Sequence, residues 1–135
     1  MKKKEYIYKS MNEKDKNHLN FIIACEWLDK KIKNHHLSEY LTKQNIHSVA
    51  IYGVGELGKL LIEELAGSEV DIRYCIENGI SNLSGNIKVI SKNDNFEYVD
   101  AVIVTPCYYY YDIQQELKRK IDTRIISLEK IVYEM

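Results

Sequence analysis

The stretch from residue 48 to residue 59 constrains the fold of this chain more than any other part of the sequence. Its apolar residues 49–51 are followed by Gly53, Gly55 and Gly58 in the spacing G-x-G-x-x-G. A short apolar run, closely spaced glycines and a helical pattern, in this order, predict a strand that turns tightly into a helix. The free N–H groups and the positive dipole end of such a helix favour an anion. The stretch therefore predicts nucleotide binding, and it specifies no reaction.

Each glycine of this turn has its own predicted role. Gly53 allows the tight bend, Gly55 lets the backbone approach a pyrophosphate, and Gly58 lets the helix pack closely on the strand. We call residues 53–58 the glycine turn. The residues expected to hold the ligand there are Gly53, Val54, Gly55, Glu56, Leu57 and Gly58.

An acidic residue in the next predicted strand agrees with this interpretation. Glu77 follows Gly53 by about 24 residues, close to the spacing at which an acidic residue accepts hydrogen bonds from an adenosine ribose. Its charge would repel a 2′-phosphate, and no arginine directly follows it in the sequence. We therefore expect NAD rather than NADP as the cofactor.

Glu56 supports a competing interpretation. Its carboxylate falls in the first turn of the helix, where it would compete with a phosphate for the same positive dipole end. In this alternative the glycines only make a tight strand-to-helix turn and Glu56 stabilises the helix. The nucleotide site would then be vestigial, and the chain would be a non-catalytic interaction or assembly domain.

The rest of the chain alternates between helical and strand patterns. Strands that alternate with helices predict an α/β fold with a parallel sheet covered on both faces. We expect a reduced Rossmann-like sheet of about five strands in the order 3-2-1-4-5, because the loop composition of residues 78–86 leaves little room for a helix. An α-helical arm (residues 1–46) precedes this nucleotide-binding domain (residues 47–135). The expected helices are 11–33, a short one capped by Ser38 and stopped at Asn45, 56–66, 111–120 and 128–134, and the expected strands are 48–52, 70–76, 87–90, 98–105 and 123–127.

The predicted switch point lies between the first and fourth strands, so residues 105–111 should line the ligand crevice together with the glycine turn. Thr105 is a candidate phosphate donor, and Tyr108 begins a run of four tyrosines that could stack on a base. The alternatives are that the Thr-Pro pair only ends the strand and that the tyrosines serve core, rim and dimer contacts. Cys107 has no histidine near it in the predicted fold, so it is not assigned as a nucleophile, and no other catalytic residue is assigned. No metal ligand is assigned either.

Composition excludes several classes of function. The formal net charge is -1 and the basic residues are scattered, so no nucleic-acid partner is expected. No apolar run approaches the ~20 residues of a membrane helix. The three cysteines form no C-x-x-C pair, which favours a cytoplasmic setting. We expect Cys25 and Cys75 to be buried as small apolar residues. The helical stripe Leu19, Ile22, Ile23 and Trp27 should pack on the sheet or on a second copy, and we expect a homodimer through this helix.

Residues 51–59 with residues 70–78 resemble the Rossmann-like NAD(P)-binding domains of bacterial polysaccharide and sugar-nucleotide biosynthesis proteins. Residues 86–91 and 100–106 look like their third and fourth strands, and the resemblance covers about residues 47–135. It implies a domain that binds NAD or a sugar nucleotide and is accessory to surface-polysaccharide metabolism. Residues 55–59 also look like the first turn of ATP-grasp amino-terminal domains, in which the fold serves structure. The Tyr-x-x-x-Lys pair of full dehydrogenases is missing, so enzymatic activity stays open, with an NAD-dependent oxidoreductase-like activity as the form it would take.

Overall fold

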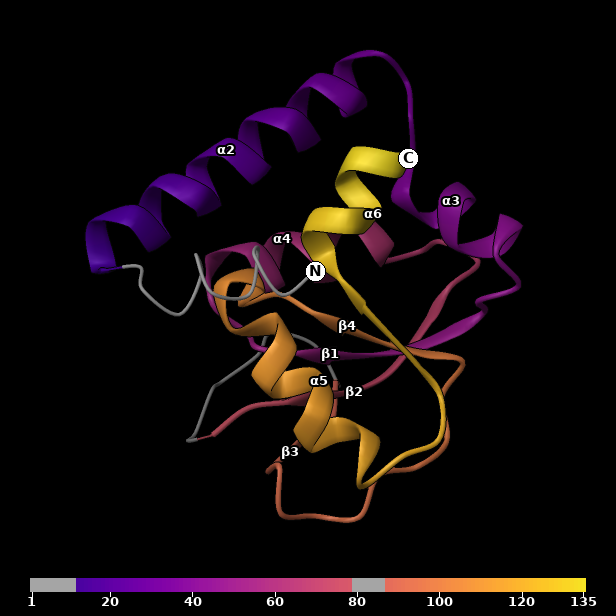
Figure 1. Ribbon diagram of the computed structural model, residues 1–135. Helices are drawn as coiled ribbons and strands as arrows, with labels where there is room; N and C mark the ends of the chain where they lie inside the picture. Colours follow the sequence, from indigo (N-terminus) through magenta and orange to yellow (C-terminus); the bar gives the residue numbers. More distant parts are fainter. Residues whose placement is uncertain (1–11, 79–86) are drawn as a thin grey trace.

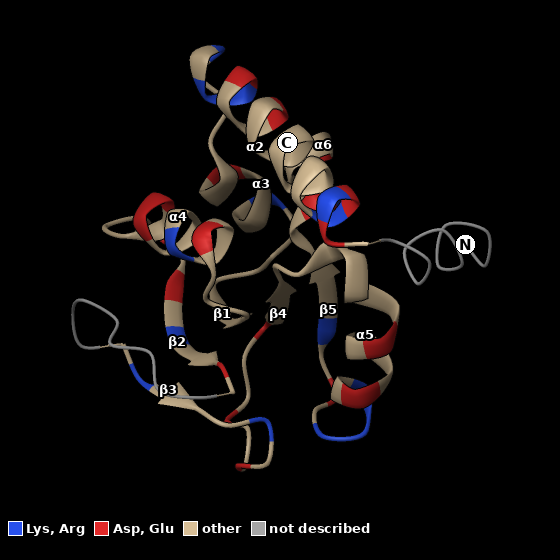
Figure 2. Cartoon of the chain, turned by 90° about the vertical axis from the view of Figure 1, so that its left-hand side faces the viewer, with Lys and Arg blue, Asp and Glu red and all other residues tan. Residues whose placement is uncertain are grey.

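The computed structural model describes residues 12–78 and 87–135, and within them five parallel strands form one sheet. Their order is β3-β2-β1-β4-β5, which confirms the predicted α/β fold and the strand order 3-2-1-4-5 (Figure 2). At the centre of the sheet, Ile51 pairs with Cys75 on one side and with Ile103 on the other. The strands are β1 (Ser48–Tyr52), β2 (Asp71–Ile76), β3 (Val89–Ile90), β4 (Ala101–Val104) and β5 (Arg124–Ser127).

Every predicted helix forms, with bounds that differ from the predicted ones by a few residues at most. Residue 11, where the first helix was expected to begin, and most of the predicted loop 78–86 lie outside the described residues. A 3-10 turn, η1 (Cys107–Tyr109), precedes the fourth helix of the described chain. The helices are α2 (Glu13–Ile32), α3 (Leu37–Lys43), α4 (Glu56–Leu65), α5 (Tyr110–Lys118) and α6 (Leu128–Glu134).

The helices cover both faces of the sheet because the strand side chains alternate between two apolar clusters. Val49 and Ile51 face the cluster that is closed by α4, α6 and α3, whereas Ala50 faces the cluster closed by α5. Helix α2 lies outermost, and α6 lies between it and the sheet (Figure 1). The described part of the helical arm therefore shares one core with the domain.

A carboxylate of α4 ties the two helices of the arm to the domain. Glu64 accepts hydrogen bonds from Trp27 Nε1 at 2.6 Å and from the backbone N–H of Leu37 at 2.8 Å. Lys31 of α2 adds an ion pair at 3.3 Å. Since Glu64 caps the first N–H of α3, this helix begins at Leu37 with His36 as its N-cap residue. The prediction of Ser38 as the N-cap was wrong, because a side chain distant in sequence performs the capping.

Helix α2 has apolar residues on two opposite sides. Leu19, Ile23 and Trp27 of the predicted stripe are buried in the core, whereas Ile22 is exposed. Cys25 is exposed as well, so its predicted burial was wrong, while Cys75 is buried as expected. Cys25 lies two residues from Ile23 and Trp27, and at about 100° per residue this places it on the outward side of the helix. Within residues 12–78 and 87–135, no helix has both the length and the apolar content needed to cross a bilayer.

Candidate functional site

The glycine turn lies where β1 ends and α4 begins, and two of its glycines are required by the fold. Gly53 has a positive φ of 92°, and a Cβ there would lie 2.7 Å from Thr105 Oγ1. A Cβ on Gly58 would lie only 2.2 Å from the carbonyl oxygen of Gly53. The predicted roles of Gly53 in the bend and of Gly58 in close helix packing therefore agree with the geometry.

Gly55 is different, because nothing among the described residues requires a glycine there. Its φ is −75°, and a Cβ at this position would meet no atom of residues 12–78 and 87–135 within 4 Å. Gly55 is the N-cap residue of α4 and supplies no side chain to cap the helix. The first intrahelical bond runs from Lys59 N to Gly55 O at 3.0 Å, so the N–H groups before Lys59 have no carbonyl partner within α4. This end of the helix opens toward a space that an added side chain would fill.

Glu77 lies directly beside the turn. Its Oε2 accepts a hydrogen bond from the backbone N–H of Val54 at 2.6 Å. Backbone hydrogen bonds at the end of the sheet position Glu77. Glu77 N donates to Ile90 O and Gly53 N donates to Ile76 O, each at 3.0 Å. The second strand thus delivers the predicted acidic residue to the glycine turn, with one carboxylate oxygen engaged by the turn itself.

A groove of about 750 Å³ lies over the turn and is lined by all of the predicted site residues. The other wall of the groove comes from α2, and none of its residues was predicted to line the site. The side-chain oxygen Oδ1 of Asn20 is buried and has no hydrogen-bond partner within the described chain. The sequence offered one signal for this wall, because Asn20 is a polar residue inside the apolar run 19–23. That signal did not indicate which part of the protein Asn20 would face. The wall that α2 contributes consists of Asn17, Asn20, Phe21 and Ala24.

The charge of this groove is negative. Glu56 and Glu77 both line it, and its described lining contains no lysine, arginine or histidine. The lysine and arginine positions, blue in Figure 2, are dispersed along the described chain. The ammonium group of Lys16 lies 5.3 Å from the centre of the Tyr108 ring and hydrogen-bonds to the Tyr109 hydroxyl. The helix end is therefore the main positive element that faces a ligand in the groove.

Thr105 and Cys107 lie at the carboxyl end of β4, and their side chains bond to the backbone. Thr105 is buried, and its Oγ1 lies 2.8 Å from the carbonyl oxygen of Gly53 and 3.1 Å from that of Tyr52. The single hydroxyl proton of Thr105 is thus donated to the backbone next to the turn, and the hydroxyl contributes to the site by stabilising the position of Gly53. The thiol of Cys107 is buried and contacts the carbonyl oxygen of Thr105 at 3.3 Å.

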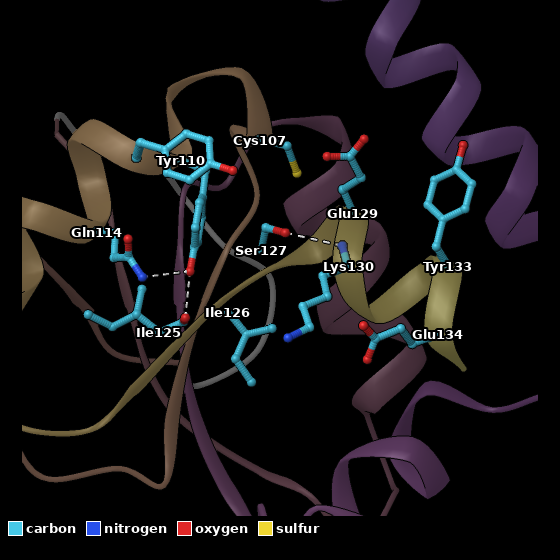
Figure 3. A pocket seen from close by; sticks show the side chains of 11 residues that line it. Cys107, Tyr110, Gln114, Ile125, Ile126, Ser127, Glu129, Lys130, Tyr133 and Glu134 are labelled. Carbon is cyan, nitrogen blue, oxygen red and sulfur yellow. Dashed lines mark hydrogen bonds between the residues drawn. The ribbon is translucent and has the colours of Figure 1, made fainter. Parts of the chain in front are cut away.

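The tyrosine run divides between two cavities. Tyr108 lines the groove over the glycine turn, where desolvation raises the pKa of its hydroxyl. Tyr110 and Tyr111 line a separate cavity of about 710 Å³ between α5, β5 and α6 (Figure 3). There the Tyr110 hydroxyl donates to Ile125 O at 2.6 Å, and burial raises its pKa to about 12. Only the first tyrosine of the run thus reaches the predicted ligand crevice.

The described residues contain no cluster of three or more histidine, cysteine, aspartate or glutamate side chains able to hold a metal ion. No protein-family model, no curated protein and no solved structure matches this chain.

Proposed function

We propose that the chain is a nucleotide-binding module that holds NAD over the glycine turn. The observation that carries this proposal is Gly55, which has neither a packing contact nor a backbone angle that requires glycine. A diphosphate that approaches the backbone at this position supplies the missing reason, because any side chain would occupy the same space. The uncapped N–H groups of α4 would then bind the diphosphate oxygens.

The charge of the groove supports NAD over other nucleotides. Two carboxylates and no basic side chain disfavour ligands that carry several uncompensated phosphates. The positive nicotinamide ring of oxidised NAD offsets part of its diphosphate charge, whereas a UDP-sugar has no such group. The additional 2′-phosphate of NADP would lie close to Glu77, where like charges repel. The free oxygen of Glu77 can accept from the adenosine ribose while its partner oxygen stays on Val54 N.

The α2 wall supports the same ligand. Phe21 and Tyr108 offer aromatic faces to a base, and Asn20 brings an amide with an unpaired oxygen. These groups line the same groove as the glycine turn, so a dinucleotide bound there would contact both the helical arm and the end of the sheet. Asn20 could then satisfy its side-chain oxygen with a ligand N–H or hydroxyl.

Two specific observations favour the second candidate, an interaction or assembly domain with a vestigial nucleotide site. The Val54 N–H is already satisfied by Glu77, and Glu56 places a negative charge in the first turn of α4. In that case the carboxylates of Glu77 and Glu56 occupy the place of the anion that such a turn would otherwise bind. The two candidates make opposite predictions for ligand binding.

A thermal-shift titration separates them. NAD, NADP, a UDP-sugar, coenzyme A and S-adenosylmethionine are each titrated into the purified protein up to millimolar concentration. Stabilisation by NAD that exceeds that by NADP supports the proposal. Absence of any shift favours the vestigial site, and a larger shift with S-adenosylmethionine than with NAD would assign the groove to a nucleoside without a diphosphate.

The biological setting that we propose is sugar-nucleotide or surface-polysaccharide metabolism in the cytoplasm, where the module is an accessory component. This setting follows from the resemblance of residues 51–59 and 70–78 to domains of such proteins. An oxidoreductase activity would require substrate groups from a partner chain. Steady oxidation of NADH by the purified protein alone would assign the activity to this chain.

A further inference from the structure

The buried side-chain oxygen of Asn20 is a polar group that the fold does not use. Asn20 lies on α2, and its Oδ1 has no hydrogen-bond partner among residues 12–78 and 87–135. A buried acceptor without a donor lowers stability, and a donor supplied by a ligand would remove that cost. Asn20 also lines the groove over the glycine turn, so a molecule bound there can supply the missing donor.

The order of the strands places two walls of this groove on opposite sides of the glycine turn. The turn follows β1, which lies between β2 and β4 in the sheet (Figure 2). Glu77 follows β2 on one side, whereas Thr105 and Tyr108 follow β4 on the other. A dinucleotide with its adenosine ribose at Glu77 and its diphosphate over the turn therefore has its second nucleoside on the Tyr108 side.

Asn20 belongs to the Tyr108 side of the groove. Helix α2 packs on α6, which follows β5, the neighbour of β4 in the sheet. One helical turn before Asn20, the ammonium group of Lys16 lies 5.3 Å from the centre of the Tyr108 ring. Because residues four apart lie on the same side of a helix, Asn20 and Tyr108 line the same part of the groove.

We propose that Asn20 recognises the carboxamide of the nicotinamide ring and thereby determines which pyridine ring the groove accepts. This inference rests on the proposed function, because it requires the adenosine ribose at Glu77 and the diphosphate over the glycine turn. The carboxamide has an N–H donor for Asn20 Oδ1 and a carbonyl acceptor for the N–H groups of the Asn20 amide, so the two amides are complementary. Tyr108, on the same side, offers an aromatic face to the positive pyridinium ring.

Calorimetric titration with NAD and with 3-acetylpyridine adenine dinucleotide tests this role. The analogue has a methyl group in place of the carboxamide NH₂ and keeps the positive ring, both phosphates and the adenosine. We expect wild type to bind NAD about tenfold more tightly, because the analogue has no donor for the Asn20 oxygen. This preference should disappear in Asn20→Leu. Asn17→Ala is the matched control, since Asn17 is an amide in the same wall and its loss should leave the preference unchanged.

The outcomes separate this inference from the proposed function. If neither dinucleotide binds at millimolar concentration, the proposed function is refuted and the role of Asn20 is refuted with it. If both bind wild type equally well, or if Asn20→Leu keeps the preference for NAD, the groove binds a dinucleotide but Asn20 does not read the carboxamide.

The reverse orientation of the ligand has its own probe. In nicotinamide hypoxanthine dinucleotide, an oxygen replaces the 6-amino group of adenine. We expect this exchange to change the affinity of wild type and of Asn20→Leu by the same factor. A loss of affinity that occurs in wild type and is absent in Asn20→Leu would place the adenine at Asn20 and overturn the proposal.

Urea unfolding of the free protein distinguishes a ligand contact from a structural role of the same amide. Because Oδ1 of Asn20 is unpaired without a ligand, Asn20→Leu should unfold at the same urea concentration as wild type or at a higher one. A clearly lower midpoint, or a variant that does not fold, would show that the amide serves the fold and would contradict the proposal.

Discussion

The carboxylate of Glu77, at the end of β2, accepts a hydrogen bond from the backbone N–H of Val54 at 2.6 Å, at the centre of the glycine turn. The contact joins two strands that are neighbours in the sheet and holds the acid at the entrance of the groove. It also places a negative charge next to the helix end that would bind a phosphate. The charge of Glu77 should therefore decide which dinucleotide the groove accepts.

Glu77→Gln should reduce the preference for NAD over NADP by about five- to tenfold. The glutamine oxygen can still accept from Val54 N, so the turn is retained while the repulsion of a 2′-phosphate disappears. The ratio of the two dissociation constants, measured by calorimetry, tests this prediction. Glu56→Gln is the control, because it should strengthen binding of both dinucleotides without changing their ratio. An unchanged ratio in Glu77→Gln would refute the assigned role.

The glycines of the turn should differ sharply in their tolerance of a side chain. Gly58→Ala places a Cβ 2.2 Å from Gly53 O and should cost about 3 kcal/mol or more in the free energy of unfolding. Gly55→Ala meets nothing within 4 Å and should cost at most about 1 kcal/mol, the difference between these residues as N-caps. Urea unfolding of the two variants provides the comparison. Equal losses would show that Gly55 is also required by the fold.

Glu64→Ala should destabilise the protein by about 2–4 kcal/mol, because it leaves the partly buried N–H groups of Trp27 and Leu37 without an acceptor. Trp27 is the single tryptophan of the chain, so its fluorescence should report the loosening of α2 directly. Glu63→Ala is the matched control, since Glu63 is exposed on the same helix. Similar unfolding midpoints for the two variants would contradict the role of Glu64.

Asp100 should contribute stability that is lost in acid. Its carboxylate accepts from the backbone N–H groups of His47 and Ser48 at 2.8 and 3.2 Å, which lowers its pKa in the folded state. A lowered folded-state pKa stabilises the protein above the unfolded-state pKa, and the effect disappears as the pH falls through the folded-state pKa. Asp100→Asn should therefore cost about 0.5–1 kcal/mol at neutral pH and little near pH ~2. Urea unfolding at both values tests this, and an equal cost at both would contradict it.

Local patterns predicted the sheet well, because glycine spacing and apolar runs are local signals. Ser48–Tyr52 and Leu128–Glu134 have the predicted bounds, and the strand order follows from the alternation of strands and helices. Long-range contacts account for what was missed. The start of α3 depends on Glu64, which lies 27 residues away in sequence.

In the candidate site, too, local patterns predicted one part and long-range contacts determine the other. The glycine turn and Glu77 meet as their spacing predicted, since parallel strands end at one edge of the sheet. The wall formed by Asn20 and Phe21 depends on how α2 crosses the domain, which its own period does not specify. The exposure of Cys25 depends on the same packing, because both sides of α2 are apolar and only the folded domain selects one.

The backbone amide resonances of the glycine turn report directly on whether NAD binds there. In a ¹⁵N-labelled sample titrated with NAD, we expect saturable shifts of the amide signals of Glu56, Leu57 and Gly58, and the loss of these shifts in folded Gly55→Val. These uncapped N–H groups of α4 are the atoms proposed to bind the diphosphate, so their signals must show some of the largest shifts. Amide signals of the turn that stay unchanged at millimolar NAD would contradict the account.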